Sequence, residues 1–160
     1  MNHKEMALRH LAGRSRSIRE ITVYLKRKGL SSQETSEIVG QLISEGLLND
    51  VAYGMEYIRY GLAKNKAKRR IKMELVDKGL SSEDFQTAWE ILVEEGDLGL
   101  ADPFWEKKKA EELAWVWLNQ EPITEKSLRK VAGKLKTLGY DSDTIYHTIG
   151  KWMDKTTEEG

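Results

Sequence analysis

The sequence predicts an all-α protein of three tandem three-helix repeats, helix-turn-helix-like in form, that build an elongated array. The pentapeptide KGLSS occurs at residues 28–32 and again at residues 78–82. Ile21 precedes the first copy by the same distance as Ile71 precedes the second. Matches that persist at one fixed offset are typical of stacked supersecondary units. β-Branched residues nowhere alternate over a useful length, so no strand is expected.

A third, weaker copy of the repeat follows about sixty positions after the second. It is carried by Val131, Leu135, Gly139, Tyr140 and Ser142. The same spacing of apolar residues, glycine and serine therefore occurs three times, which predicts three repeats.

The first repeat opens with a predicted helix over residues 5–12. Ser17, with a glutamate three residues later, forms a capping-box pattern that begins a second helix. Gly29 ends that helix, because glycine adopts the left-handed conformation at C′ without steric cost. Ser31 begins the third helix by another capping pair, and Gly46 ends it.

The second and third repeats contain the same signals. A helix is predicted over residues 50–64, with Asn49 or Asp50 as its N-cap. Gly79 ends the helix that follows, as Gly29 does in the first repeat. The third repeat begins with a helix predicted over residues 105–119.

These signals divide the chain into five segments. We expect three repeats at residues 1–46, 47–96 and 105–154, a linker at residues 97–104 and a tail at residues 155–160. The linker contains two glycines and a proline, residues typical of loops.

Two groups of helix positions are expected to depend on packing. Ile71 and Leu75 lie on one apolar stripe and are predicted core residues of the middle repeat. Gly40, Gly54 and Gly61 fall inside predicted helices, where each glycine costs up to ~1 kcal/mol relative to alanine. Close contacts between helices are the hypothesis that accounts for them.

Composition indicates a soluble, cytoplasmic protein. The 160-residue chain has 32% charged residues and no cysteine, which excludes disulfides and thiolate metal sites and suits a reducing compartment. It has no apolar run near the roughly 20 residues that span a bilayer, and its first residues lack a signal-peptide pattern.

Charge is divided unevenly along the chain. Residues 1–80 carry 16 Lys+Arg against 9 Asp+Glu, whereas residues 81–160 carry 10 against 17. This asymmetry favours a polyanionic or acidic partner for the first half of the chain.

No catalytic, metal or cofactor site is expected. The histidines are His3, His10 and His147, and they lack ligand spacing. The acidic doublets at residues 94–95 and 111–112 occupy adjacent helix positions, whose side chains point in different directions. Three tryptophans, Trp105, Trp115 and Trp117, are better explained by core packing than by a binding platform. The chain is therefore not expected to be an enzyme.

One basic stretch of the sequence is a candidate binding site. Six of the nine residues of KNKAKRRIK, at 64–72, are basic. Together with an arginine of the preceding helix they form what we call the basic junction: Arg59, Lys64, Lys66, Lys68, Arg69, Arg70 and Lys72. Such a patch suits nucleic acid, because each phosphate it neutralises releases condensed counterions. A merely solubilising run is the alternative. Because Lys68, Arg69 and Arg70 lie off the apolar stripe, reversing their charge is expected to leave folding nearly intact.

Sequence-specific reading by a helix-turn-helix motif is not favoured. In that motif the second helix enters the major groove and presents basic or amide side chains. The corresponding helices, residues 32–45 and 82–95, contain no lysine or arginine and several acidic residues. Phosphates would repel both helices.

Four blocks spread over nearly the whole chain resemble the RecX family, regulatory proteins that bind and usually restrain the RecA recombinase. They are ALRHLAGRSRSIREITVYLKRKG (7–29), GLLNDVAYGMEYIRY (46–60), RRIKMELVDKGLS (69–81) and LKTLGYDSDTI (135–145). The third block is the most specific. The family commonly has Gly-Pro just before it, where this chain has Ala67-Lys68, so the join between helices is expected to differ in shape.

The resemblance implies a non-enzymatic modulator without a cofactor. Such a protein lies in the groove of the RecA–DNA filament and lowers ATPase activity, filament growth and strand exchange in recombination, DNA repair and the SOS response. The basic junction would face the filament, single- or double-stranded DNA could be bound directly, and a monomer is expected. The competing hypothesis is a nucleic-acid-binding protein that acts without RecA.

Overall fold

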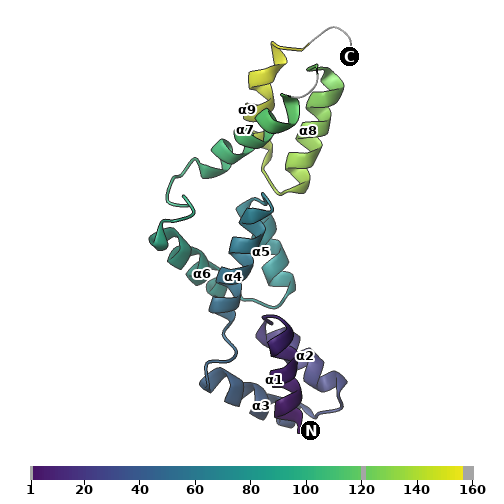
Figure 1. Ribbon diagram of the computed structural model, residues 1–160, viewed down its shortest axis with the longest axis vertical. Helices are drawn as coiled ribbons and strands as arrows, with labels where there is room; N and C mark the ends of the chain where they lie inside the picture. Colours follow the sequence, from purple (N-terminus) through teal and green to yellow (C-terminus); the bar gives the residue numbers. More distant parts are fainter. Residues whose placement is uncertain (1, 120–121, 157–160) are drawn as a thin grey trace. The chain divides into compact units, whose positions relative to one another are not determined.

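The protein is all-α, as predicted. A computed structural model describes residues 2–119 and 122–156, and within these ranges it contains helices and no strand (Figure 1). The helices are α1 (His3–Gly13), α2 (Ile18–Arg27), α3 (Ser32–Ser44), α4 (Asp50–Ala63), α5 (Lys68–Asp77), α6 (Ser82–Glu95), α7 (Trp105–Leu118), α8 (Glu125–Thr137) and α9 (Ser142–Met153). Residues 157–160 of the predicted tail lie outside the described residues.

The predicted N-terminal caps are confirmed. Ser17 accepts a hydrogen bond from the N–H of Glu20, whose carboxylate accepts one from the N–H of Ser17. Ser31 begins α3 with the same reciprocal pair. Asn49 accepts a hydrogen bond from the N–H of Ala52 and so caps α4. Each cap satisfies backbone donors that the first turn of a helix leaves without a partner.

The glycines predicted to end the second helix of each repeat have left-handed backbone conformations. Gly29, Gly79 and Gly139 have φ values of 96°, 103° and 97°. In each case the glycine follows the helix and lets the chain turn into the next serine- or aspartate-capped helix. The helix–glycine–turn–helix pattern is therefore present three times.

Two compact units can be described separately. The first unit comprises residues 1–59 and 72–91, and the second comprises residues 60–71 and 92–160. These limits run through the middle repeat, and the division into three repeats with a linker at 97–104 remains a prediction.

Each unit has its own buried apolar cluster. In the first unit the cluster consists of Ala7, Ile21, Leu25, Leu30, Val39, Leu42 and Leu48. In the second unit it consists of Ala67, Ala110, Leu113, Ala114, Leu118, Leu128, Val131, Leu135 and Tyr140. Ile71 and Leu75, the predicted core residues of the middle repeat, are both fully buried.

The hypothesis of close contacts explains two of the three glycines inside helices. A Cβ atom on Gly61 would lie 2.7 Å from Cγ1 of Ile71, and one on Gly54 would lie 3.0 Å from Cδ2 of Leu80. At Gly40 a Cβ atom would meet no heavy atom of the described residues within 4 Å, so the hypothesis is wrong there.

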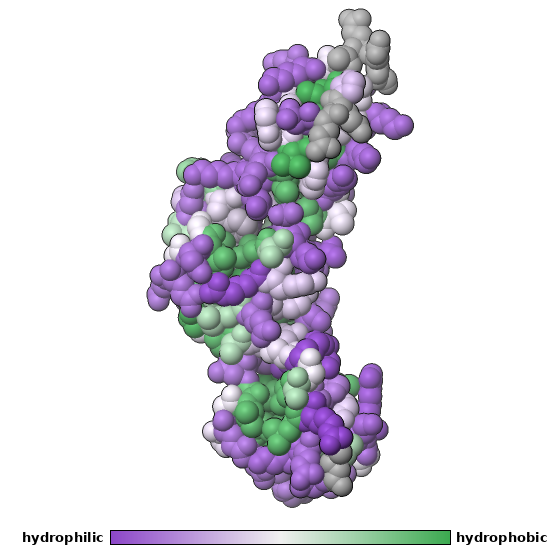
Figure 2. Space-filling view, viewed as in Figure 1, coloured by the Kyte–Doolittle hydropathy of each residue, from purple (hydrophilic) through white to green (hydrophobic). Residues whose placement is uncertain are grey.

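The visible face of the molecule is largely hydrophilic, with hydrophobic residues gathered in separate patches (Figure 2). None of the helices in the described ranges is long and apolar enough to cross a membrane.

Candidate nucleic-acid interface

The residues of the basic junction lie on two helices and the turn between them. Arg59 is in α4, Lys64 and Lys66 are in the turn, and the other four are in the first half of α5. Lys64, Arg69 and Lys72 are exposed, and the remaining four are partly buried. Arg59 and Lys72 belong to the first unit, and the other five belong to the second.

The start of α5 is held against the third repeat by hydrogen bonds from two backbone N–H groups. The N–H of Ala67 donates to the carbonyl of Leu138 at 2.9 Å, and Ala67 itself is fully buried. The N–H of Lys68 donates to Oε1 of Glu106 at 3.1 Å. A proline at position 68 would lack this donor. Lys68 therefore supplies a hydrogen bond at this join that a proline at the same position could not supply.

Arg70 has a packing role that the sequence did not predict. Its Nη1 donates to the carbonyl of Thr137 at 3.0 Å. A Cβ atom on Gly139 would lie 2.5 Å from Cβ of Arg70 and 3.1 Å from its backbone nitrogen. Charge reversal at Arg70 would remove the hydrogen bond at this contact, so the expectation that folding stays nearly intact does not extend to Arg70.

Two lysines of the basic junction lie near an aromatic ring, and one of its arginines lies near an acidic helix cap. Lys64 and Lys66 place their Nζ atoms 5.7 and 5.8 Å from the ring centre of Tyr60, which is 53% exposed. Hydrogen bonds from Thr144 are the main cause of a lowered pKa at Asp141, and the charge of Arg69 lowers that pKa further. An exposed ring beside flexible cations can accommodate bases as well as phosphates.

The first unit contains another join between repeats, which has the same kind of contacts as the join at Lys68. The N–H of Ile18 donates to Oδ1 of Asp50 at 2.9 Å, as that of Lys68 does to Glu106. Nη2 of Arg19 donates to the carbonyl of Asp77 at 2.6 Å. At both joins an acidic residue at the start of one repeat caps the second helix of the preceding repeat. The sequence carried this signal, since Asp50 and Glu106 each lie in the first turn of a repeat.

Burial is the largest influence on both capping carboxyls and raises the pKa of Asp50 and of Glu106 above the ordinary value. The hydrogen bond from the capped N–H acts in the opposite direction, because it favours the ionised form. A nearby carboxylate raises each pKa further, Asp84 in the case of Asp50 and Asp141 in the case of Glu106. Both caps therefore retain their protons to higher pH in the folded protein.

Combining Asp50→Asn with Glu106→Gln should reduce the loss of folding stability that the native chain shows as pH rises from about 4 to about 7. A raised folded-state pKa means that the contribution of the group is complete below its ordinary pKa of about 4 and is lost as pH rises through the raised value. The amide variants keep an acceptor oxygen and do not titrate. The free energy of urea unfolding, measured for both proteins between about pH 4 and pH 7, should fall more with pH in the native chain. Identical pH profiles would contradict the assignment.

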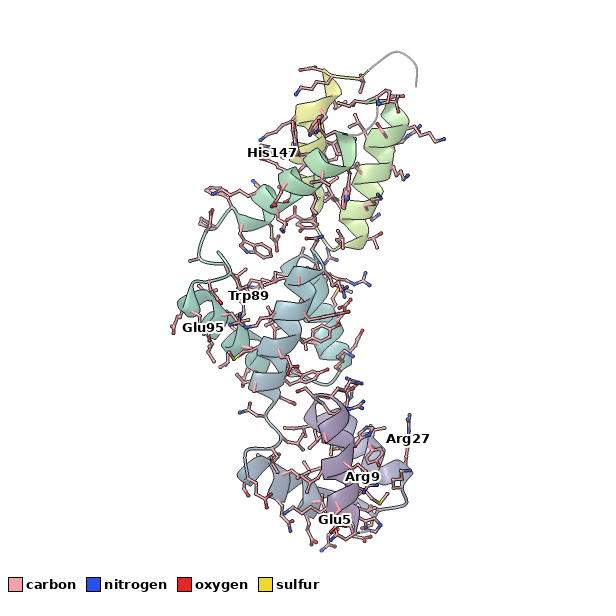
Figure 3. All side chains as sticks on the ribbon, in the orientation of Figure 1. Glu5, Arg9, Arg27, Trp89, Glu95 and His147 are labelled. Carbon is pink, nitrogen blue, oxygen red and sulfur yellow. The ribbon has the colours of Figure 1, made fainter. Side chains whose placement is uncertain are left out.

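Other polar and aromatic residues considered from the sequence have local roles. Among residues 2–119 and 122–156, no group of three or more His, Asp or Glu side chains is placed to hold a metal ion. The ring of His10 stacks on Tyr24 at 3.9 Å. His147, labelled in Figure 3, has Nε2 3.5 Å from Oε1 of Glu111. His10 therefore packs against an aromatic ring, and His147 lies beside a carboxylate at the surface.

The expectation that all three tryptophans of α7 pack in the core is wrong for Trp115. It is 55% exposed, whereas Trp117 packs against the buried cluster of the second unit and Trp105 is partly buried. Leu113 and Leu118 are buried on the inward side of α7, so a side chain at position 115 projects from another face of the helix.

These features define a class of protein: an all-α tandem repeat whose repeats are joined through capped helix ends, with a cluster of cations at one join. A family model described as the first three-helix domain of RecX matches residues 4–42. A protein of Mycobacterium leprae named "Regulatory protein RecX" is 27% identical over 90% of this chain and 81% of its own length. The protein of that name from Mycolicibacterium smegmatis is 26% identical over 91% and 77%.

A solved structure has the same fold. The crystal structure of RecX from Lactobacillus salivarius superposes with a TM-score of 0.72 at 24% identity and covers 95% of this chain and 94% of that one. The chain is thus similar in sequence to RecX regulatory proteins along nearly its whole length, and its fold is that of a RecX crystal structure.

Proposed function

We propose that the protein binds the RecA recombinase in its nucleoprotein filament and lowers filament growth, ATPase activity and strand exchange. The observation that carries this proposal is similarity to proteins named "Regulatory protein RecX" along nearly the whole chain, rather than in one repeat alone. The protein would act in the cytoplasm as a monomer, without a cofactor and without catalysis of its own.

The basic junction is the part of the surface that we assign to the DNA-bearing filament. Lys64 and Arg69 are its exposed cations in the second unit, and Tyr60 adds an exposed ring beside Lys64. Lys and Arg that neutralise phosphates contribute affinity that falls with salt. The packed side chain of Arg70 contributes to the join itself.

The direct test measures ATP hydrolysis by RecA on single-stranded DNA with and without this protein. Inhibition at ratios matched to the filament supports the proposal. An unchanged hydrolysis rate, together with salt-sensitive binding of this protein to bare DNA, would instead support the competing function of a nucleic-acid-binding protein that acts without RecA.

Replacing Lys64 and Arg69 with glutamate should weaken inhibition of RecA by about tenfold or more in the concentration required, an order-of-magnitude expectation for the removal of two phosphate-binding cations. Both side chains are exposed, so thermal unfolding should change little. The matched control reverses Lys126 and Lys130, two exposed lysines of α8. Equal inhibition by the two double variants across a salt series would show that the basic junction is only a solvated surface.

A further inference from the structure

A groove of about 420 Å³ lies in the first unit, and none of the residues of the basic junction lines it. Four cationic side chains do so, those of Arg16, Arg19, Arg27 and Lys78. They come from the segment before α2, from α2 itself and from the turn after α5. Figure 3 shows the side chain of Arg27 extending outward from its helix. The groove therefore gathers positive charge from two segments that are distant in sequence.

Arg16 presents a hydrogen-bond donor that the protein does not use. Its Nε atom is buried and has no acceptor within the described residues. A buried donor without a partner costs the full desolvation of that group, so such atoms are rare in native structures. An anion seated against this guanidinium would supply the acceptor. Arginine suits that role, because its planar fork can donate two parallel hydrogen bonds to one phosphate.

Two acidic residues, Glu20 and Asp77, line the groove beside its four cations, so they reduce its positive charge without cancelling it. Glu20 is already engaged, since it accepts hydrogen bonds from the N–H of Ser17 and from Nη2 of Arg14. Burial lowers the pKa of His10, and the charges of Arg16 and Arg14 lower it further. The same positive charges that disfavour a protonated His10 would attract an anion.

The remaining lining favours a nucleic acid over a carboxylate-rich peptide. Tyr24 lies stacked against His10, and Val23 beside it is 41% exposed, so an apolar wall adjoins the cations. Proteins that bind single strands combine a positive groove for the backbone with apolar or aromatic surface for the bases. The volume is at the lower end of the range of about 300–1,000 Å³ typical of ligand sites, which suits one nucleotide unit.

We infer that this groove binds the phosphate backbone of single-stranded nucleic acid, as a contact site separate from the basic junction. The inference does not depend on RecA, because the groove and its unpaired donor belong to this chain alone. It adds a second set of residues with which the protein holds a strand.

The test measures fluorescence anisotropy of a labelled oligothymidylate with the full chain, over a series of salt concentrations and without RecA. Arg16→Gln combined with Arg27→Gln should weaken binding and reduce the log–log salt slope by roughly 1.4, because each phosphate that a cation neutralises on a single strand adds about 0.7 to that slope. Lys126→Gln combined with Lys130→Gln removes the same charge from α8 and should leave the slope nearly unchanged. Arg27→Gln alone, at an exposed position, keeps the test valid if the double variant folds poorly.

Two results would overturn the inference. One is an equal slope for the groove variant and the α8 control. The other is displacement of the labelled strand by polyglutamate as readily as by unlabelled oligothymidylate of equal charge, which would assign the groove to an acidic protein segment. Since RecA is absent, either result leaves the proposed regulation of RecA standing.

Discussion

Replacing Gly139 with alanine should destabilise the protein by about 2–5 kcal/mol. At a φ of 97° an L-residue pays about 1–2 kcal/mol for the left-handed conformation. The added Cβ atom would also lie 2.5 Å from Cβ of Arg70 and 3.1 Å from its backbone nitrogen. Because the backbone of α5 cannot rotate away as a side-chain tip can, overpacking adds about 1–3 kcal/mol. Urea unfolding followed by circular dichroism measures the change.

The repeats provide a matched control for this substitution. Gly29 has nearly the same φ, 96°, but a Cβ atom there would meet no heavy atom of the described residues within 4 Å. Gly29→Ala should therefore cost only the conformational part, about 1–2 kcal/mol. Gly79→Ala, whose Cβ would lie 2.5 Å from Cβ of Arg19, should cost more than Gly29→Ala. Equal losses of stability for Gly29→Ala and Gly139→Ala would show that the contact between Gly139 and Arg70 can widen without a loss of stability.

Replacing Leu75 with alanine should cost about 2–5 kcal/mol of unfolding free energy. Leu75 is fully buried, so the substitution removes apolar packing and leaves a cavity that neighbouring side chains fill only in part. The destabilisation should appear as a lower midpoint in urea with a similar slope, since little surface area changes.

The next residue of α5 is the control for Leu75. Val76 is 41% exposed, and Val76→Ala should change stability by no more than about 0.5 kcal/mol. A cost below about half a kcal/mol for Leu75→Ala as well would contradict the assignment of this stripe to the core.

Two arginines contribute both to the joins between repeats and to the proposed binding surfaces. At each join an arginine near the start of one helix donates a hydrogen bond to a carbonyl at the end of another helix. Arg19 donates to Asp77, and Arg70 donates to Thr137. Arg19 also lines the groove of the first unit, and Arg70 belongs to the basic junction. Variants meant to test binding should therefore use exposed neighbours such as Arg27 and Arg69, so that weaker binding is not confused with impaired folding.

Local signals in the sequence were sufficient for the helices and their ends. The capping pairs at Ser17 and Ser31 and the glycine turns at Gly29 and Gly79 act within a few residues, and the structure confirms each of them. The apolar spacing that predicted a buried Leu75 is likewise a property of one helix. The repeat itself, and with it the all-α fold class, could be recognised because the same local signals recur.

Only the tertiary structure decided what the charged residues do. Glu106 caps the N–H of Lys68 from 38 positions away, and Arg70 reaches a carbonyl 67 positions away. No spacing rule joins residues so distant, because their proximity depends on how one repeat packs against the next. The tertiary structure also shows that Nε of Arg16 is buried and that Trp115 is exposed. Composition shows that a segment is basic, but which of its cations face solvent and which hold helices together is set by contacts between repeats.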